Sequence, residues 1–224
     1  MLYGKEMKMA DIVRFMISKR QLIVDATLQH IFISLVAVLL GALVAIPLGI
    51  LLTRKKGMAK PIMAVAGIVQ TIPSLVLFGL AMPVFGIGIK TGLIVLVLYS
   101  ILPILQNTYT GIREVEHKYI EAAKGMGMGS IQVLLNIELP IALPVIVAGM
   151  RISTVYIISW ATIAALIGSG GLGDLIFTGL QTYNYNMILS GALPACLLAL
   201  VTGALIGAVQ KAVTPKGLRN WKGG

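Results

Sequence analysis

Long apolar stretches separated by short charged segments dominate this chain of 224 residues. Ranges 30–53, 61–89, 91–112 and 175–210 contain no Asp, Glu, Lys or Arg, and range 139–173 contains only Arg151. The hydrocarbon core of a bilayer, about 30 Å thick, requires about 20 apolar residues of helix, and each range can provide them. The pattern predicts an all-α, polytopic membrane protein with about five transmembrane helices, at 28–53, 60–84, 91–112, 139–166 and 188–211.

The same pattern predicts three regions. Residues 1–27 form an N-terminal tail, in which the mixed apolar and charged stretch 11–29 favours an amphipathic helix at the membrane surface before the first span. Residues 28–211 form the transmembrane domain, and residues 212–224 form a basic cytoplasmic tail. A six-span arrangement would cut range 61–112 into three very short helices, so we expect five spans with the N-terminus outside.

The distribution of basic residues predicts the orientation. The chain is 58% hydrophobic and 12% charged, with a net charge of +10. If the loop 113–138 is cytoplasmic, the loops and tail on that side carry 11 Lys and Arg residues, whereas the external loops between spans carry only Lys90. This asymmetry follows the positive-inside rule. The basic residues of the N-terminal tail argue the other way, and the surface helix accounts for them.

Composition argues against several other classes of protein. The basic residues flank the spans and form no aromatic-interleaved stretch, so we expect no nucleic-acid binding. One cysteine, Cys196, and two distant histidines, His30 and His117, predict neither a disulfide nor a metal or cofactor site. We expect both histidines to be interfacial or solvated. The spans contain no paired carboxylates or other catalytic group, and no phosphate-binding loop of the G-x-x-x-x-G-K-[S/T] type occurs, so we do not expect an enzyme.

The loop 113–138 contains the most informative motif. Glu121-Ala122-Ala123 is followed after three residues by Gly127, and after nine more by Ile137, one residue and Leu139-Pro140. Glu-Ala-Ala alone is a helix-forming tripeptide, and Gly127 alone could be a helix stop. The complete pattern, in a polar loop between spans, resembles the cytoplasmic loop of permease subunits of binding-protein-dependent ABC importers. The resemblance implies a coupling helix that docks on a cytoplasmic ATPase through Tyr119, Glu121, Ala122, Ala123, Gly125, Gly127, Leu139 and Pro140.

Prolines and polar residues within the spans mark a candidate translocation path. Gln70-Thr71-Ile72-Pro73-Ser74 and Ser100-Ile101-Leu102-Pro103 place polar groups at predicted helix kinks. Two interpretations remain open, a path lined by kinked helices and helix packing with polar contacts. The path candidates are Gln70, Thr71, Pro73, Ser74, Ser100, Pro103, Asn107 and Arg151. The glycines Gly41, Gly49, Gly203 and Gly207 are expected to be packing contacts.

Arg151 is the only charged residue inside a predicted span, and no acidic residue lies in the spans to pair with it. Intramembrane charges usually face a cavity or a partner. Carbonyl groups freed by Pro144 or by a neighbouring kinked helix could accept its hydrogen bonds, and Glu138 could reach it through water. We expect a structural role, with substrate contact as the alternative.

The segment 168–174, Gly-Ser-Gly-Gly-Leu-Gly-Asp, satisfies the G-x-G-x-x-G spelling of dinucleotide-binding loops. It follows a membrane span rather than a strand, which excludes that function. It resembles instead the external turn after the fourth span of importer permeases for osmoprotectants and methionine. The resemblance implies that Gly168, Gly170, Gly171, Gly173 and Asp174 face the substrate-binding protein.

Taken together, residues 25–218 resemble the permease subunits of osmoprotectant ABC importers, which carry glycine betaine, carnitine or choline. Besides the segments above, the resemblance rests on Ile68–Leu75 (IVQTIPSL), Leu102–Gly111 (LPILQNTYTG), Trp160–Thr162 and Thr214–Leu218. It implies a multi-pass protein of a prokaryotic plasma membrane, with a second permease subunit, two ATPase subunits and an external substrate-binding protein. Some members of this group carry that protein fused after the last span. Because the sequence ends at Gly224, we expect a separate one.

Two alternative functions remain. The importer could carry another small solute, such as an amino acid or ergothioneine. An ion-coupled secondary carrier is disfavoured, because such carriers commonly place Asp or Glu within their spans and often contain inverted repeats, and this chain has neither.

Overall fold

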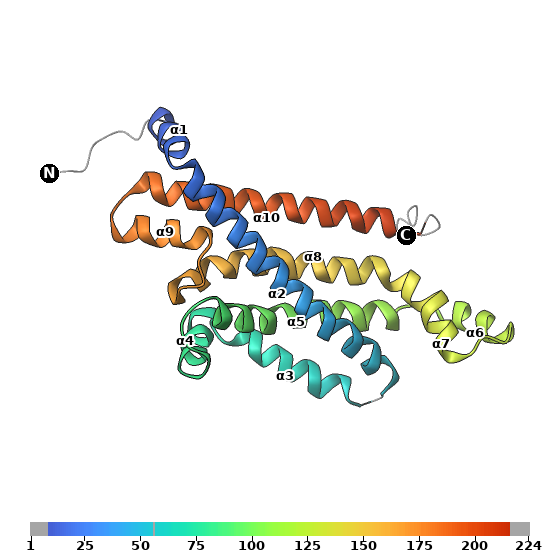
Figure 1. Cartoon of the computed structure of the whole chain (residues 1–224). Helices are drawn as coiled ribbons and strands as arrows, with labels where there is room; N and C mark the ends of the chain where they lie inside the picture. Colours follow the sequence, from blue (N-terminus) through green and yellow to red (C-terminus); the bar gives the residue numbers. More distant parts are fainter. Residues whose placement is uncertain (1–8, 56, 216–224) are drawn as a thin grey trace. The chain divides into compact units, whose positions relative to one another are not determined.

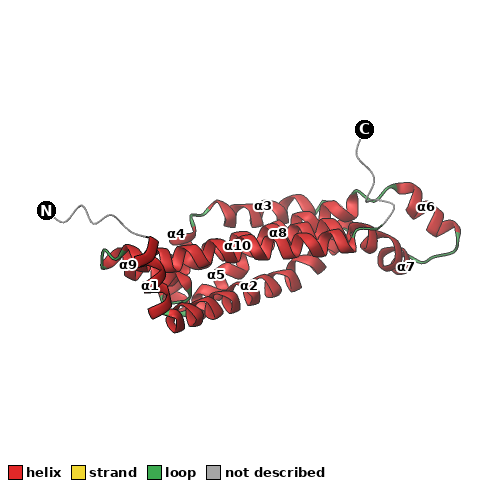
Figure 2. Cartoon of the chain, turned by 90° about the horizontal axis from the view of Figure 1, so that it is seen from above, coloured by secondary structure: helices red, strands yellow, loops and turns green. Residues whose placement is uncertain are grey.

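A computed structural model describes residues 9–55 and 57–215, and within these ranges the chain consists of helices and loops without a strand (Figure 2). This confirms the predicted all-α fold. The α-helices are α1 Met9–Ser18, α2 Arg20–Arg54, α3 Ala59–Thr71, α4 Ser74–Phe85, α5 Ile89–Arg113, α6 His117–Gly125, α7 Ser130–Val133, α8 Leu139–Ala164, α9 Leu172–Gln181 and α10 Tyr185–Val213. The predicted basic tail lies outside the described residues from position 216 onward.

Four helical segments are long and apolar enough to span a membrane: α2, α5, the run Ser130–Ile167 that contains α8, and α10. They correspond to four of the predicted spans. Helix α2 begins at Arg20, so the second half of the predicted surface helix 11–29 is continuous with the first span, and only α1 is separate.

The predicted second span, 60–84, is not one straight helix. It is broken into α3 and α4, and the chain bends by 96° at the break. Pro73 stands at this break; it lacks a backbone N–H, and it disfavours helical geometry for Ile72 before it. The pair is therefore either one broken span or a re-entrant loop, and the described chain has four or five spans.

The fold divides into two compact units. The first combines the described residues up to Ala37 with 72–96 and 156–200, and the second combines 38–71, 97–155 and the described residues from Val201 onward. The long helices α2, α5, α8 and α10 contribute to both units.

In the first unit, α9 folds back along the first turns of α10 (Figure 1). A core of Leu172, Leu175 and Ala195 holds the two helices together. Their close approach requires glycine: a Cβ at Gly191 would lie 2.7 Å from the carbonyl oxygen of Leu172. Sequence analysis did not predict α9, because its ten residues are too short to span and include Asp174.

In the second unit, α2, α5 and α8 pack through a core of Ile112, Ala142 and Ile146. The predicted packing role of the span glycines is confirmed. A Cβ added at Gly41 would lie 1.7 Å from Ser100 Oγ, and one at Gly49 would lie 2.8 Å from the Thr108 side chain. A Cβ at Gly203 would lie 3.3 Å from Val155, and one at Gly207 would lie 3.3 Å from Arg151. Small residues let helix backbones approach closely where lipid provides no hydrophobic drive.

Candidate functional site

A helix, α6, forms where the sequence predicts the coupling helix, and together with α7 it lies beyond the ends of α5 and α8 (Figures 1 and 2). Its C-terminus is closed by two backbone hydrogen bonds, from Gly127 N to Lys124 O at 2.9 Å and from Met128 N to Ala123 O at 3.1 Å. These are the two bonds of a Schellman motif, which requires a left-handed residue at the position of Gly127. Gly127 indeed has φ +85°, so it ends the helix, as the simpler interpretation of that residue proposed.

The small residues of α6 divide into an inner and an outer set. Ala123 is 1% exposed, and α6 as a whole contacts α7 and the turn Leu134–Glu138 of the same loop. Ala122 and Gly125 are exposed, and a Cβ added at Gly125 would meet no atom within 4 Å. The outer face of α6 is therefore narrow, and no other part of the described chain covers it.

Charged and aromatic side chains border this narrow face. Glu121 pairs with His117 at 3.3 Å, and the Lys118 ammonium lies 5.0 Å from the centre of the Tyr119 ring. A hydrogen bond to the Glu116 carboxylate raises the pKa of Lys118. All five side chains are exposed, so a partner can reach them.

The loop joins α8 through a π-helical turn, Leu134–Glu138. The N–H of Leu139 donates to the carbonyl of Leu134, five residues back, and the next residue, Pro140, has no N–H to donate. Leu139 packs against the core of the second unit, whereas Pro140 is exposed. Of the two motif residues assigned to docking, Leu139 therefore anchors the loop and Pro140 remains on the surface.

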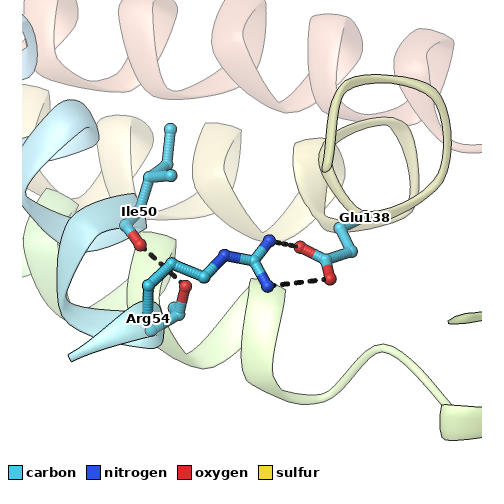
Figure 3. A network of polar contacts seen from close by, with 4 residues as sticks. Ile50, Arg54 and Glu138 are labelled. Atoms are coloured by element: carbon cyan, nitrogen blue, oxygen red, sulfur yellow. Dashed lines mark hydrogen bonds and ion pairs between the residues drawn. The ribbon is translucent and has the colours of Figure 1, made fainter. Parts of the chain in front are cut away.

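Glu138 forms a two-pronged ion pair with Arg54, the last residue of α2 (Figure 3). Arg54 Nη1 donates to Oε1 at 3.2 Å, and Nη2 donates to Oε2. The Glu138 side chain is 3% exposed and that of Arg54 is 46% exposed. Glu138 is thus committed to Arg54, which corrects the suggestion that it reaches Arg151. Sequence analysis missed this pair because 84 positions separate the partners.

Several polar path candidates already have partners within the second unit. The side-chain amide of Gln70 donates to Tyr99 O at 3.1 Å, and the side-chain amide of Asn107 donates to Pro103 O at 2.8 Å. The hydroxyl of Thr71 donates to Ile68 O at 2.7 Å, and the hydroxyl of Ser100 donates to Val97 O at 2.7 Å. Pro103 is buried. Only the bond of Gln70 joins two helices, α3 and α5, which favours packing for that residue. The other three bonds return to a carbonyl of the same helix, so the two interpretations stay open for Thr71, Ser100 and Asn107. Pro73 and Ser74 belong to the first unit, and Arg151 is exposed.

The glycine turn is held against α2 in the first unit. The side chain of Gln29 accepts a hydrogen bond from Gly171 N at 3.1 Å and donates one to Ser169 O at 3.3 Å. Gly170 and Gly171 are buried with φ +81° and +85°, so they shape the turn.

The remaining residues of the turn differ in exposure. Gly173 is buried, and a Cβ there would lie 2.1 Å from Thr162 O. Gly168 and Asp174 are exposed, and desolvation by neighbouring atoms raises the pKa of the Asp174 carboxyl. They are therefore the two predicted residues of the turn that a partner could reach.

The two histidines have different surroundings. His117 is exposed, as expected. His30, expected at the interface or in solvent, is instead fully buried, with Nε2 3.0 Å from the Ile158 carbonyl oxygen. Among the described residues no cluster of His, Cys, Asp or Glu could hold a metal ion.

A helical membrane protein with a capped helix projecting beyond its spans, in a loop with this motif, belongs to the class of transport-system membrane components. The family described as "Binding-protein-dependent transport system inner membrane component" matches residues 37–218, and the chain belongs to this family. It is therefore a multi-pass inner membrane protein.

Curated relatives cover nearly the whole chain. It is 45% identical to the choline transport system permease protein OpuBB of Bacillus subtilis, over 96% of this chain and 99% of that protein. It is 46% identical to the carnitine transport permease protein OpuCB of Listeria monocytogenes, over 88% of this chain and 91% of that one. It is 39% identical to the osmoprotectant import permease protein OsmW of Salmonella typhimurium, over 93% and 100%.

Solved structures confirm the fold. A structure of the MetNI methionine ABC transporter in an inward-facing conformation superposes with a TM-score of 0.78 at 21% identity, covering 88% of this chain and 99% of the matched one. An amino acid ABC transporter solved with histidines gives a TM-score of 0.74 at 19% identity, over 93% and 100%.

Proposed function

We propose that this chain is the permease subunit of an ABC importer that brings quaternary-ammonium osmoprotectants such as glycine betaine, carnitine or choline into the cell. The observation that carries the proposal is the 45% identity over 96% of the chain to a permease named for choline transport, alongside relatives named for carnitine and osmoprotectant import. The likeness to amino acid importers is near 20% identity and supports the fold alone.

The proposal includes partner chains. Backbone polar groups cannot face lipid, so a water-filled path needs a closed ring of spans, and four or five spans in one chain make a small ring. A second permease subunit, identical or homologous, would complete it. ATP hydrolysis would occur on two cytoplasmic ATPase subunits, and an external binding protein would deliver the substrate to the side of Gly168 and Asp174.

Helix α6 is the proposed docking element for the ATPase. Its loop and the loop after α2 carry most of the basic residues between spans, which favours a cytoplasmic location. The exposed small residues Ala122 and Gly125 would let the helix sit in a cleft, and Glu121 and Tyr119 would contact the rim. Ala123 and Leu139 support the loop from within, and Gly127 sets its turn.

Bulk on the outer face of α6 tests this assignment. Ala122 is exposed, and a Cβ at Gly125 would meet no atom of the described residues within 4 Å, so Ala122→Trp and Gly125→Leu should leave the thermal midpoint of the chain unchanged. We expect both to abolish copurification of the ATPase and substrate uptake. Met58→Trp, at an exposed position in the loop after α2, is the matched control and should do neither. If the α6 variants still bind the ATPase and transport substrate, α6 is not the docking helix.

The substrate class is tested by uptake in cells that lack other osmolyte importers. The chain is expressed with its ATPase and binding protein at high external salt, and uptake of labelled glycine betaine, carnitine and choline is measured. We expect saturable uptake of at least one of them that depends on this chain. Uptake of an amino acid with none of the three would contradict the proposal.

A further inference from the structure

Arg151 lies deep within its span. The ion pair between Arg54 and Glu138 fixes the level at which α2 ends, because Arg54 is the last residue of that helix. Arg151 follows Glu138 by 13 positions, which is about 20 Å along the helix at about 1.5 Å per residue. A bilayer core is about 30 Å thick, so the guanidinium lies near its middle.

The described part of the chain leaves this guanidinium without an acceptor. Arg151 is exposed, and among residues 9–55 and 57–215 it makes no hydrogen bond or ion pair. The carboxylate suggested for it, Glu138, is occupied by Arg54. What the second unit does provide is a flat support: at Gly207 of α10, a Cβ would lie 3.3 Å from both Cζ and Nη1 of Arg151.

An exposed, unpaired charge at this depth cannot face lipid, since such charges nearly always point to the interior of a bundle or to a water-filled cavity. The side of α8 that carries Arg151 must therefore face water or another protein chain in the assembled transporter. Because its five N–H donors have no acceptor within the described chain, the group is available to a ligand that passes along this side.

We propose that Arg151 binds the carboxylate of a zwitterionic substrate in the translocation path. A guanidinium presents parallel N–H donors that match the two oxygens of a carboxylate. All three compounds carry a quaternary ammonium group. Glycine betaine and carnitine also carry a carboxylate, whereas choline has a hydroxyl in its place and a net positive charge that Arg151 would repel. The inference rests on the proposed function and goes further: the importer favours quaternary ammonium compounds that bear a carboxylate. The proposal adopts the substrate contact that sequence analysis gave as the alternative to a structural role for Arg151.

Thiol labelling in the complete transporter tests whether Arg151 faces water. The sequence has one cysteine, so Cys196→Ala removes the background reaction of this chain, and the label is measured on this chain after it is separated from its partners. In that background, Arg151→Cys should react with a trimethylammonium-ethyl thiosulfonate at least about tenfold faster than Ser153→Cys. Ser153 is the matched control because it lies two positions away and is fully buried. Equal rates at the two positions would overturn the placement, whatever the substrate of the importer.

Uptake by the reconstituted permease, ATPase and binding protein tests the carboxylate contact. We expect Arg151→Gln to lower uptake of glycine betaine and carnitine at least about tenfold, the effect of losing one charge-assisted hydrogen bond, and to leave choline uptake unchanged or raised. Arg151→Lys should retain an intermediate rate for the zwitterions, because it keeps the charge. An equal loss for choline and the zwitterions would show a structural role and overturn the proposal.

The wild-type transporter separates the two proposals. Uptake of choline without either zwitterion would refute the role of Arg151 and leave the osmoprotectant function standing. Uptake of none of the three would refute the proposed function, and the labelling experiment would still decide whether Arg151 faces water.

Discussion

Arg54 and Glu138 form one ion pair, but we predict that removing the charge of one partner destabilises the fold more than removing the charge of the other. Both side chains take part in the same two contacts, but Glu138 is 3% exposed and Arg54 is 46% exposed. Removing Arg54 leaves a carboxylate buried without a cation. Removing the charge of Glu138 leaves a guanidinium that water can still reach.

The magnitudes follow from this difference. Removing one partner of an ion pair costs about 3 kcal/mol or more when the charge that remains is buried. We therefore expect Arg54→Met to lower the free energy of unfolding by about 3 kcal/mol. Glu138→Gln keeps one acceptor in place and should cost about 1 kcal/mol. For a chain of this size these values correspond to decreases of about 6–12 °C and about 2–4 °C in the thermal midpoint.

Thermal unfolding of the purified protein in detergent, followed by tryptophan fluorescence, provides the measurement. Lys55→Met is the matched control, because it removes one positive charge from the neighbouring exposed position and should shift the midpoint little. The double variant Arg54→Met with Glu138→Leu should recover much of the loss, since it leaves no buried charge. A larger effect for Glu138→Gln than for Arg54→Met would refute the reasoning.

Two further predictions concern glycines and the turn. Gly173→Ala should prevent stable folding, because its Cβ would lie 2.1 Å from the backbone oxygen of Thr162. Gly67→Ala is the control: its Cβ would meet no atom within 4 Å, so the thermal midpoint of the purified chain should stay equal or rise. An equal decrease of the midpoint in both variants would contradict the close approach at Gly173. Gln29→Glu removes the side-chain N–H that donates to Ser169 O, so hydrogen exchange of the backbone amides in segment 168–174 should become faster. Unchanged exchange would show that this contact does not hold the turn.

The spans were predictable because a run of uncharged, apolar residues long enough to cross the bilayer core is itself the signal of a transmembrane helix. The break at Pro73 was only partly predictable: the proline was visible as a kink, but range 60–84 has the length of a straight span, and only tertiary structure shows the bend. The sequence also left the role of Gly127 undecided, because a glycine at this position fits both a helix stop and a docking face.

Contacts between distant segments lay beyond sequence analysis. No local pattern connects Arg54 with Glu138 or Gln29 with Gly171, because 84 and 142 positions separate them. Burial was equally hidden for His30, whose polar side chain suggested an interface until the fold placed it against Ile158.

Reconstitution tests whether this chain forms the membrane path of an ATP-driven osmoprotectant importer. The permease is placed in liposomes with its ATPase and binding protein, ATP is supplied on the side of the ATPase, and entry of labelled glycine betaine, carnitine and choline from the side of the binding protein is measured. We predict accumulation of substrate against a concentration gradient, and we expect it to require ATP, the binding protein and this chain. Accumulation driven by an ion gradient without ATP, or no transport of any of the three, would contradict it.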